Sequence, residues 1–338
     1  MLRFVRIWSV LLLLWFCGST MTVTAEEVVI KFATLAPEGT PWMNLMQEMN
    51  DELKRQSNGQ ISFRFYAGGV AGDERDVIRK IRINQLQGGA FSGFGMGELL
   101  PELRVLELPM LFRDAAEAEH VATSLFDHFA KAFADKGYML LSLNEAGAVH
   151  IFSQQPLRSK ADLARAKLWT WQGDPLPQAL FKAYGVTPIP LALADVLPSL
   201  QSGLIDACYG PPLGVLALQW FTKVKYISAM AITHVMGAVL LSKQQWQTLA
   251  PEQQTLVREM VTKYNAKATV TMRQHHQKAL TLLQSLGIQS LAWPDEEIAG
   301  LRQASSKVQE ELTGQLYPRD LLEQVLRLRE QYRQSRPQ

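Results

Sequence analysis

Residues 28–66 have the sequence VVIKFATLAPEGTPWMNLMQEMNDELKRQSNGQISFRFY, and this stretch decides the fold class. The apolar, β-branched run Val28–Ala33 predicts a buried strand. Amphipathic spacing over Trp42–Arg55, closed by Asn58-Gly59, predicts a helix. The clean alternation of Ile61–Tyr66 predicts a second strand. Because strand, helix and strand follow one another, we expect an α/β fold with a mostly parallel sheet and helical crossovers.

The same alternation continues along the rest of the chain. Asp73 is expected to cap a helix that ends near Asn84, and Asp114 a second helix that ends near Lys136. Further short strands and helices are predicted at Tyr138–Leu143, Lys167–Trp171, Pro175–Tyr184, Thr187–Leu191, Asp195–Ser202 and Ile205–Tyr209.

The segment Pro251–Leu286 has no internal proline or glycine, and Gly287 follows it. As a single helix it would be about 54 Å long. This length exceeds the width of one ordinary domain, so we expect the helix to run across two lobes.

The first 25 residues have the pattern of a secretory signal peptide. Arg3 and Arg6 precede a short apolar segment, Ile7–Phe16, and Val23-Thr24-Ala25 offers small residues for cleavage after Ala25. The apolar segment is too short to span a bilayer comfortably. An uncleaved anchor or a buried helix is the alternative, but we expect a cleaved signal peptide and an exported protein.

Composition excludes several classes of function. The chain has 338 residues and a 47% hydrophobic fraction, which suits two domains. Lys and Arg (34) nearly balance Asp and Glu (32), and we find no basic cluster of the kind that nucleic-acid binding needs. Cys208 is the only cysteine after residue 25, so no internal disulfide is expected. No hydrolase elbow or His-Glu-x-x-His motif occurs, so we expect no enzyme, metal or cofactor.

The segment at 88–97, GGAFSGFGMG, is the most unusual motif. Its Gly-x-Gly-x-Gly core is similar to a phosphate-binding loop, but it lies after the first strand–helix turn and lacks the acid of a dinucleotide site. The plainer interpretation is a tight loop at a strand end. We expect the small residues to let a ligand approach the backbone, with Phe91 and Phe94 as apolar walls.

Trp169 and Trp171 alternate along a predicted strand, so both point to one face. They either pack in the core or form an aromatic wall in a cleft. His275 and His276 are adjacent and therefore point to different faces of the long helix, so they cannot share a metal ion. We expect both histidines to be solvated.

The order of these elements resembles the periplasmic solute receptors of tripartite ATP-independent periplasmic (TRAP) transporters, of the dicarboxylate-receptor type. The resemblance extends over nearly the whole chain after the signal peptide. The motifs that carry it are KFA at 31–33, SNGQI at 57–61, GDE at 72–74, LPMLF at 108–112, PLRS at 156–159, DL at 162–163, KL at 167–168, GVTPIP at 185–190, LQSGLID at 200–206 and His234.

The resemblance implies a two-lobed periplasmic binding protein fold with a long helix spanning both lobes. We expect lobe I to comprise residues 26–147 and about 236–268, and lobe II residues 148–235 and about 269–335. The resemblance also implies that a ligand is held between the lobes, which close on it. The closed receptor would deliver the ligand to the membrane permease subunits.

Several positions depart from the family pattern. The family usually has an arginine two residues after the lysine of the Lys-Leu strand, where it binds the substrate carboxylate. Trp169 stands at this position, and Val149 stands where a second arginine is common. Gly210, Leu35 and Ser92 replace an asparagine, another polar residue and an acid, whereas Glu74 keeps its polar type.

These departures indicate a different class of ligand. A carboxylate buried without a charged partner costs several kcal/mol. We therefore expect no small organic acid, but an uncharged or largely apolar molecule that is lipid-like, terpenoid or aromatic. The side chains expected to hold it are Trp169, Trp171, Phe91, Leu193 and Tyr209.

Two alternatives stay open. The chain is an ordinary organic-acid receptor that uses another arginine, such as Arg75 or Arg113, or it is an interaction or sensor protein that kept the fold without a small-molecule ligand. A related subgroup of receptors lacks the arginine and works with a periplasmic helical-repeat protein, so the resemblance adds such a protein as a candidate partner.

Overall fold

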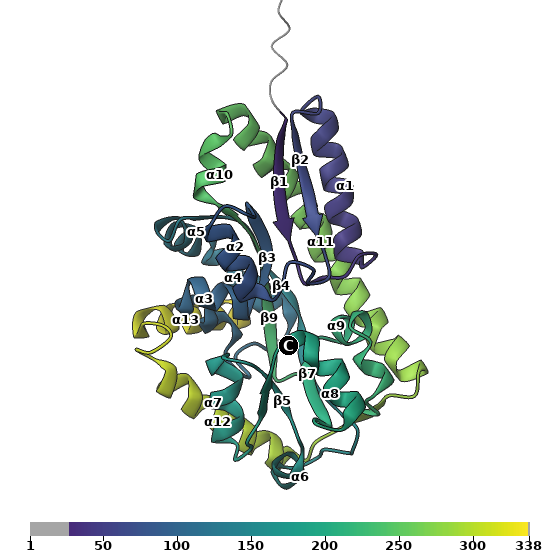
Figure 1. Ribbon diagram of the computed structural model, residues 1–338. Helices are drawn as coiled ribbons and strands as arrows, with labels where there is room; N and C mark the ends of the chain where they lie inside the picture. Colours follow the sequence, from purple (N-terminus) through teal and green to yellow (C-terminus); the bar gives the residue numbers. More distant parts are fainter. Residues whose placement is uncertain (1–26, 337–338) are drawn as a thin grey trace, which may run out of the picture.

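Two α/β lobes make up the computed structural model, which describes residues 27–336 (Figure 1). Two long antiparallel strands, β4 (Tyr138–Ser153) and β9 (Thr233–Ser242), run between the lobes. Their pairing extends from Tyr138 opposite Ser242 to Val149 opposite Thr233. The predicted α/β class is therefore confirmed, while the predicted signal peptide lies outside the described residues.

The upper lobe in Figure 1 contains a sheet with strands in the order β4, β9, β3, β1 and β2. The strands β1 (Val28–Ala33), β2 (Ile61–Tyr66) and β3 (Gly88–Ser92) are parallel. The crossover α1 (Pro41–Gln56) begins at Thr40, whose side chain accepts a hydrogen bond from the Met43 N–H. This first β-α-β unit has the order that the opening stretch of sequence predicts.

Helices cover both faces of this sheet. On one face lie α1, α10 (Lys243–Thr248) and the first half of α11 (Pro251–Ser285). On the other lie α2 (Glu74–Arg82), α3 (Gly93–Leu99), the 3-10 helix η1 (Pro101–Glu107), α4 (Ala115–Ser124) and α5 (Phe126–Asp135). The helix α2 begins at a capping box that joins Asp73 and Asp76.

The lower lobe is built around the end of β4, which pairs with β7 (Ala207–Gly210) and β8 (Tyr226–Ser228). The strand β10 (Gln289–Leu291) extends this sheet from β8. A small parallel pair, β5 (Trp169–Trp171) and β6 (Ile189–Leu191), lies beside it. The remaining helical elements of this lobe are α6 (Lys160–Arg165), α7 (Pro175–Ala183), η2 (Leu193–Asp195), α8 (Val196–Ser202), α9 (Pro212–Ala217), η3 (Trp220–Thr222) and α12 (Asp295–Leu312).

The long helix spans both lobes, as predicted. α11 has 35 residues, which corresponds to about 52 Å. It packs against α1 in the upper lobe and against α9 in the lower lobe (Figure 1). The last helix, α13 (Arg319–Ser335), packs against α4 of the upper lobe. The lobe boundaries given above stay predictions.

Two predicted elements differ from the structure. The helix expected after Asp114 is interrupted at Leu125, whose side chain is buried in the upper core, and so it forms α4 and α5. The strand expected at Tyr138–Leu143 continues to Ser153 and so reaches the lower lobe, and its pairing with β9 shifts register between Leu140 and Ser142 and between Glu145 and Gly147. Bulges of this kind leave no clear sequence pattern.

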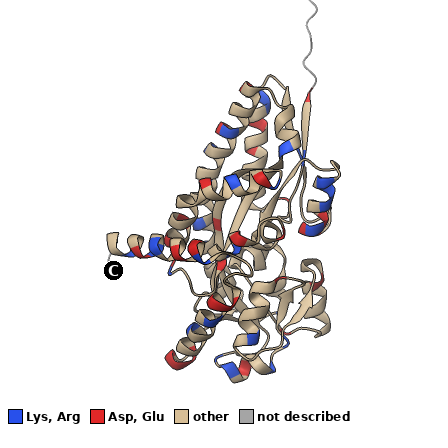
Figure 2. Cartoon of the chain, turned by 90° about the vertical axis from the view of Figure 1, so that its left-hand side faces the viewer, with Lys and Arg blue, Asp and Glu red and all other residues tan. Residues whose placement is uncertain are grey.

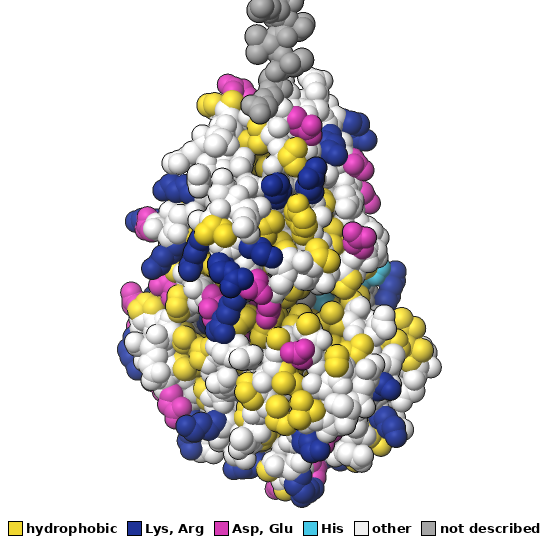
Figure 3. All heavy atoms as spheres, viewed as in Figure 1, with side chains coloured by type: hydrophobic (Ala, Val, Ile, Leu, Met, Phe, Trp, Pro, Cys, Tyr) yellow, Lys and Arg dark blue, Asp and Glu magenta, His cyan; other side chains and the backbone are white. Residues whose placement is uncertain are grey.

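Charged side chains of both signs are intermixed on the outer helices (Figure 2). Hydrophobic side chains are visible where the two lobes meet (Figure 3). Because apolar side chains are exposed between the lobes, we expect a ligand to bind there.

Candidate functional site

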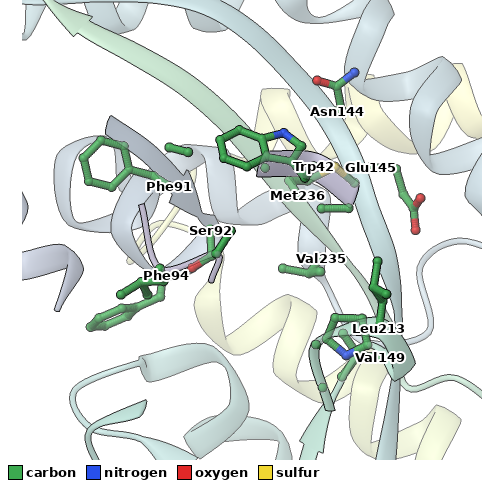
Figure 4. A pocket seen from close by; sticks show the side chains of 18 of the residues that line it. Trp42, Phe91, Ser92, Phe94, Asn144, Glu145, Val149, Leu213, Val235 and Met236 are labelled. Carbon is green, nitrogen blue, oxygen red and sulfur yellow. The ribbon is translucent and has the colours of Figure 1, made fainter. Parts of the chain in front are cut away.

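A cavity of about 440 Å³ lies between the two lobes (Figure 4). Its volume is within the range of about 300–1,000 Å³ that is usual for small-molecule sites. The structure places all ten predicted site residues in its lining: Leu35, Glu74, Phe91, Ser92, Val149, Trp169, Trp171, Leu193, Tyr209 and Gly210. In Figure 4, Phe91, Ser92 and Phe94 line one side, and Asn144 and Glu145 of β4 lie on the opposite side.

Aromatic rings form the lower wall. Trp169 stacks on Tyr209 with ring centroids 4.9 Å apart and meets Trp220 edge-on at 5.4 Å. The Trp169 Nε1–H donates to the Leu191 carbonyl at 3.1 Å, and the Trp171 N–H donates to the Tyr209 hydroxyl at 3.3 Å. Trp169 is only 1% exposed, so it belongs to the core and to the cavity wall at once.

Contacts across the cleft hold the lobes closed. Trp171 stacks on Phe94 of α3 with centroids 4.8 Å apart, and its Nε1–H donates to the Asp73 carboxylate at 3.1 Å. The Arg75 guanidinium lies 5.1 Å from the centre of the Phe94 ring. It also donates to the Gln172 carbonyl at 3.5 Å. The structure is therefore the closed form of a two-lobed protein.

The glycine-rich segment is a strand followed by a helix, so the expected strand-end loop is wrong. The Glu74 carboxylate accepts hydrogen bonds from the Ser92 N–H at 2.6 Å, the Ser92 hydroxyl at 2.8 Å and the Gly95 N–H at 2.7 Å. A Cβ at Gly95 would lie 2.6 Å from Glu74, and one at Gly93 would overlap the Glu107 carboxylate. The glycines thus make room for two buried acids of the protein itself.

Burial changes the acid–base properties of these carboxylates. It raises the pKa of Glu74 to about 7, and the hydrogen bonds from Ser92 oppose part of this shift. Burial also raises the pKa of Glu107, while the Arg104 charge beside it acts in the opposite direction. The upper wall therefore contains carboxyl groups that interact with the protein rather than with solvent.

Arg104 is the one arginine or lysine among the described lining residues, and no sequence motif predicts it. It is 5% exposed. Its Nε lies 3.2 Å from Glu107 and its Nη2 lies 3.0 Å from Asp174 of the lower lobe. Two carboxylates therefore already balance its charge. Arg104 reaches the cavity because it lies in η1, a short helix without a recognisable sequence motif.

The arginines considered as alternatives lie outside the lining that the structure describes. Arg75 is half-exposed and pairs with Glu98 at 2.7 Å. Arg113 lies 3.9 Å from Asp114 in a partly exposed pair. Neither guanidinium is placed to bind the carboxylate of a ligand inside the cavity.

His276 differs from its expected solvation. It lines the cavity, and both of its ring nitrogens are buried without a hydrogen-bond partner among the described residues. It lies four residues after Met272 and three before the buried Ala279, so the helical repeat places it on the inward face of α11. That spacing is the signal by which the sequence could have identified it. Burial lowers the pKa of His276.

A further buried polar cluster lies where the strands cross between the lobes. The Glu145 carboxylate is 2.8 Å from His234 Nδ1 and accepts a hydrogen bond from the Gly147 N–H at 3.0 Å. The Glu145 N–H donates to Glu119 at 2.7 Å. The His234 match in the family resemblance therefore corresponds to a structural contact at this crossing.

Comparison with known proteins identifies the family. The model of the bacterial extracellular solute-binding proteins, family 7, matches residues 32–315. The chain belongs to this family. It is 27% identical over 214 residues to the 2,3-diketo-L-gulonate-binding periplasmic protein YiaO of Escherichia coli, an alignment that spans 62% of this chain and 65% of that protein.

Solved structures of periplasmic solute-binding proteins share the fold. The sugar acid binding protein of Advenella mimigardefordensis, in complex with galactonate, has a TM-score of 0.85 at 18% identity, with 90% of this chain and 99% of that one covered. A TRAP periplasmic solute binding protein of Pseudomonas putida, with bound D-glucuronate, has a TM-score of 0.79 at 26% identity, covering 88% and 96%. The resemblance to TRAP receptors is therefore confirmed.

Family 7 consists of binding receptors rather than enzymes, in agreement with the expectation from sequence. Over residues 27–336, no set of three His, Cys, Asp or Glu side chains is arranged to hold a metal ion. Within the same range, no helix combines the length and the apolar character needed to cross a membrane.

Proposed function

We propose that this family 7 receptor binds an uncharged, largely apolar small molecule between its lobes in the periplasm and delivers it to TRAP permease subunits in the membrane. The observation that carries the proposal is the absence of a free cation among the described lining residues. Trp169 and Val149 stand where the family resemblance places arginines, and Arg104 is paired with two carboxylates.

The charges of the lining also disfavour an acidic ligand. Four carboxyl groups, those of Glu74, Glu107, Glu145 and Asp174, belong to the lining, against the single guanidinium of Arg104. Those of the four that are ionised repel the carboxylate of a ligand, and this repulsion grows as the dielectric constant falls. An uncharged ligand avoids this cost, and it gains about 25 cal/mol for each Å² of apolar surface that it buries.

The proposed ligand differs in chemical class from the ligands for which the relatives are named. The E. coli relative is named for 2,3-diketo-L-gulonate, and the two solved structures hold galactonate and D-glucuronate. An ordinary acid receptor would require Arg104 to exchange Glu107 or Asp174 for the ligand, which leaves a buried carboxylate unpaired. A protein without any small-molecule ligand would not need an open cavity of about 440 Å³.

The test uses the chain expressed in the periplasm, purified and extracted with organic solvent for mass spectrometry. A stoichiometric neutral apolar compound would support the proposal and name the ligand, whereas a bound sugar acid or dicarboxylate would overturn it. Thermal shift with a panel of terpenoid alcohols, aromatic alcohols and dicarboxylates gives an independent reading.

A matched pair of variants separates the cavity from the core. Phe91 and Phe129 are both buried, at 2% and 0% exposure, but only Phe91 lines the cavity. Phe91→Ala should weaken binding of the extracted compound more than Phe129→Ala does, when the affinities are compared under conditions in which both variants are folded. Equal affinities in the two variants would place the ligand elsewhere.

A further inference from the structure

The cavity continues from the cleft into the upper lobe, between the first helix and the long helix. We call this part the α1–α11 arm; it is lined by Leu45, Met46 and Met49 from α1 and by Val261, Tyr264 and Met272 from α11. Met46, Met49 and Val261 are at most 6% exposed and belong to the core of the upper lobe. The deep end of the arm is therefore apolar and closely packed, while Asn265 and Thr269 of α11 add two polar side chains to the lining.

The lining follows a single face of α11 over a long distance. Val261, Tyr264, Ala268, Met272 and His276 all line the cavity, and their spacings of three and four residues form one stripe along the helix. From Val261 to His276 this stripe is about 22 Å long. The lining thus extends along this face of α11 from the upper lobe to the cleft between the lobes.

Charged side chains join the two helices beside the arm. The Lys263 ammonium group lies 2.7 Å from Glu52, whose carboxylate also accepts a hydrogen bond from the Tyr264 hydroxyl at 2.9 Å. Lys267 pairs with Glu48 one turn further along. Glu48, Lys263 and Lys267 are exposed, so these pairs lie on the outer side of the seam between α1 and α11.

We propose that the α1–α11 arm holds a flexible linear hydrocarbon chain, and that the aromatic wall at Trp171 and Tyr209 holds the bulkier end of the same ligand. The inference rests on the proposed function and narrows its ligand class to elongated molecules. Met46, Met49 and Met272 suit this role, because unbranched thioether side chains adapt to a chain that has several conformations. A rigid, compact molecule would leave the arm empty.

The test measures the affinity of the purified chain for hexanol, octanol, decanol and dodecanol, with benzyl alcohol as a compact probe. Each methylene that enters the arm should strengthen binding about fourfold. Ala268→Trp fills the arm and should remove this dependence on chain length, so that decanol and dodecanol bind no more tightly than hexanol. Val270→Trp is the matched control, because Val270 lies on the same helix and is 59% exposed.

Met46→Phe gives a second, smaller obstruction if the tryptophan variant does not fold, and it should shorten the longest chain that gains affinity. Equal affinity for all four alcohols, with benzyl alcohol still bound, would show that the arm does not hold the chain, while the proposed function would remain supported. Failure of every apolar probe to bind, together with binding of a sugar acid, would overturn both.

Discussion

The upper and lower walls of the cavity are stabilised by different interactions. The upper wall contains buried charged groups, Glu74, Glu107 and Arg104, that are bound to backbone N–H groups and to one another. The lower wall contains stacked aromatic rings, Trp169 and Tyr209, whose polar atoms are engaged in hydrogen bonds within that wall. Changes in the upper wall should therefore alter folding stability and its pH dependence, and changes in the lower wall should alter ligand affinity.

The largest effect is expected from Arg104→Met. This change leaves Glu107 and Asp174 buried without their shared cation, and such a loss typically costs about 3–5 kcal/mol. Urea unfolding of the ligand-free protein measures it. The control is Arg79→Met, which removes an exposed pair with Asp76 and should cost at most about 1 kcal/mol. Equal losses in the two variants would show that the buried cluster is not what stabilises the upper wall.

The second effect is a pH dependence that Glu74 confers. Its pKa is raised from 4.5 to about 7 in the folded protein, so between these values the folded state binds a proton that the unfolded state has released. The free energy of unfolding should therefore fall as pH rises through this interval, by about 3 kcal/mol in total.

Urea unfolding at pH values below, within and above the interval tests this sign. Glu74→Gln should remove the contribution of Glu74 to the slope of unfolding free energy against pH. Glu38→Gln, in the exposed first loop, is the control and should retain that contribution. A stability that instead rises with pH in both the parent protein and Glu38→Gln would contradict the assignment.

A smaller effect is expected at the glycines of α3. Gly95→Ala places a Cβ 2.6 Å from the Glu74 carboxylate and 2.8 Å from the Phe91 ring, and overpacking of this kind costs about 1–3 kcal/mol. The nearest atom to a Cβ at Gly300, in α12, is 3.6 Å away. Gly300→Ala should therefore be neutral or stabilising by up to about 1 kcal/mol. A neutral Gly95→Ala would show that the wall relaxes around the added methyl group.

The two walls also differ in how well the sequence predicts them. Local patterns predict β1, α1 and β2 because Pro, Gly and Asn mark their ends and apolar spacing marks their faces. The positions of Trp169, Val149 and Gly210 in the cavity followed from the family motifs around them. In each of these cases the informative residues lie within a few positions of one another.

The missed features depend on contacts between distant residues. Arg104 and Asp174 are 70 positions apart, and Glu74 and Gly95 are 21 positions apart. No local pattern shows that GGAFSGFGMG accommodates carboxylates from two other helices. His276 was misplaced for a related reason, since its burial requires the packing of α11 against both lobes, although its spacing from Met272 and Ala279 does indicate an inward face.

The smallest effect is expected at Trp171, where the two walls meet. Its ring stacks on Phe94 and its Nε1–H binds Asp73, so it stabilises the closed form rather than either lobe alone. Trp171→Ala should weaken binding of an apolar probe such as decanol about twofold to tenfold, with little change in urea unfolding. Small-angle X-ray scattering should also show a larger radius of gyration for the ligand-free variant.

Trp171→Phe separates the two contacts of this side chain. A phenylalanine can keep the stack on Phe94 but cannot donate to Asp73, so an intermediate affinity would assign part of the closure energy to each contact. If Trp171→Phe binds as weakly as Trp171→Ala, the hydrogen bond to Asp73 is the decisive contact. If neither variant changes affinity or shape, closure depends on the buried Arg104–Asp174 pair, and the upper wall then controls ligand capture as well as stability.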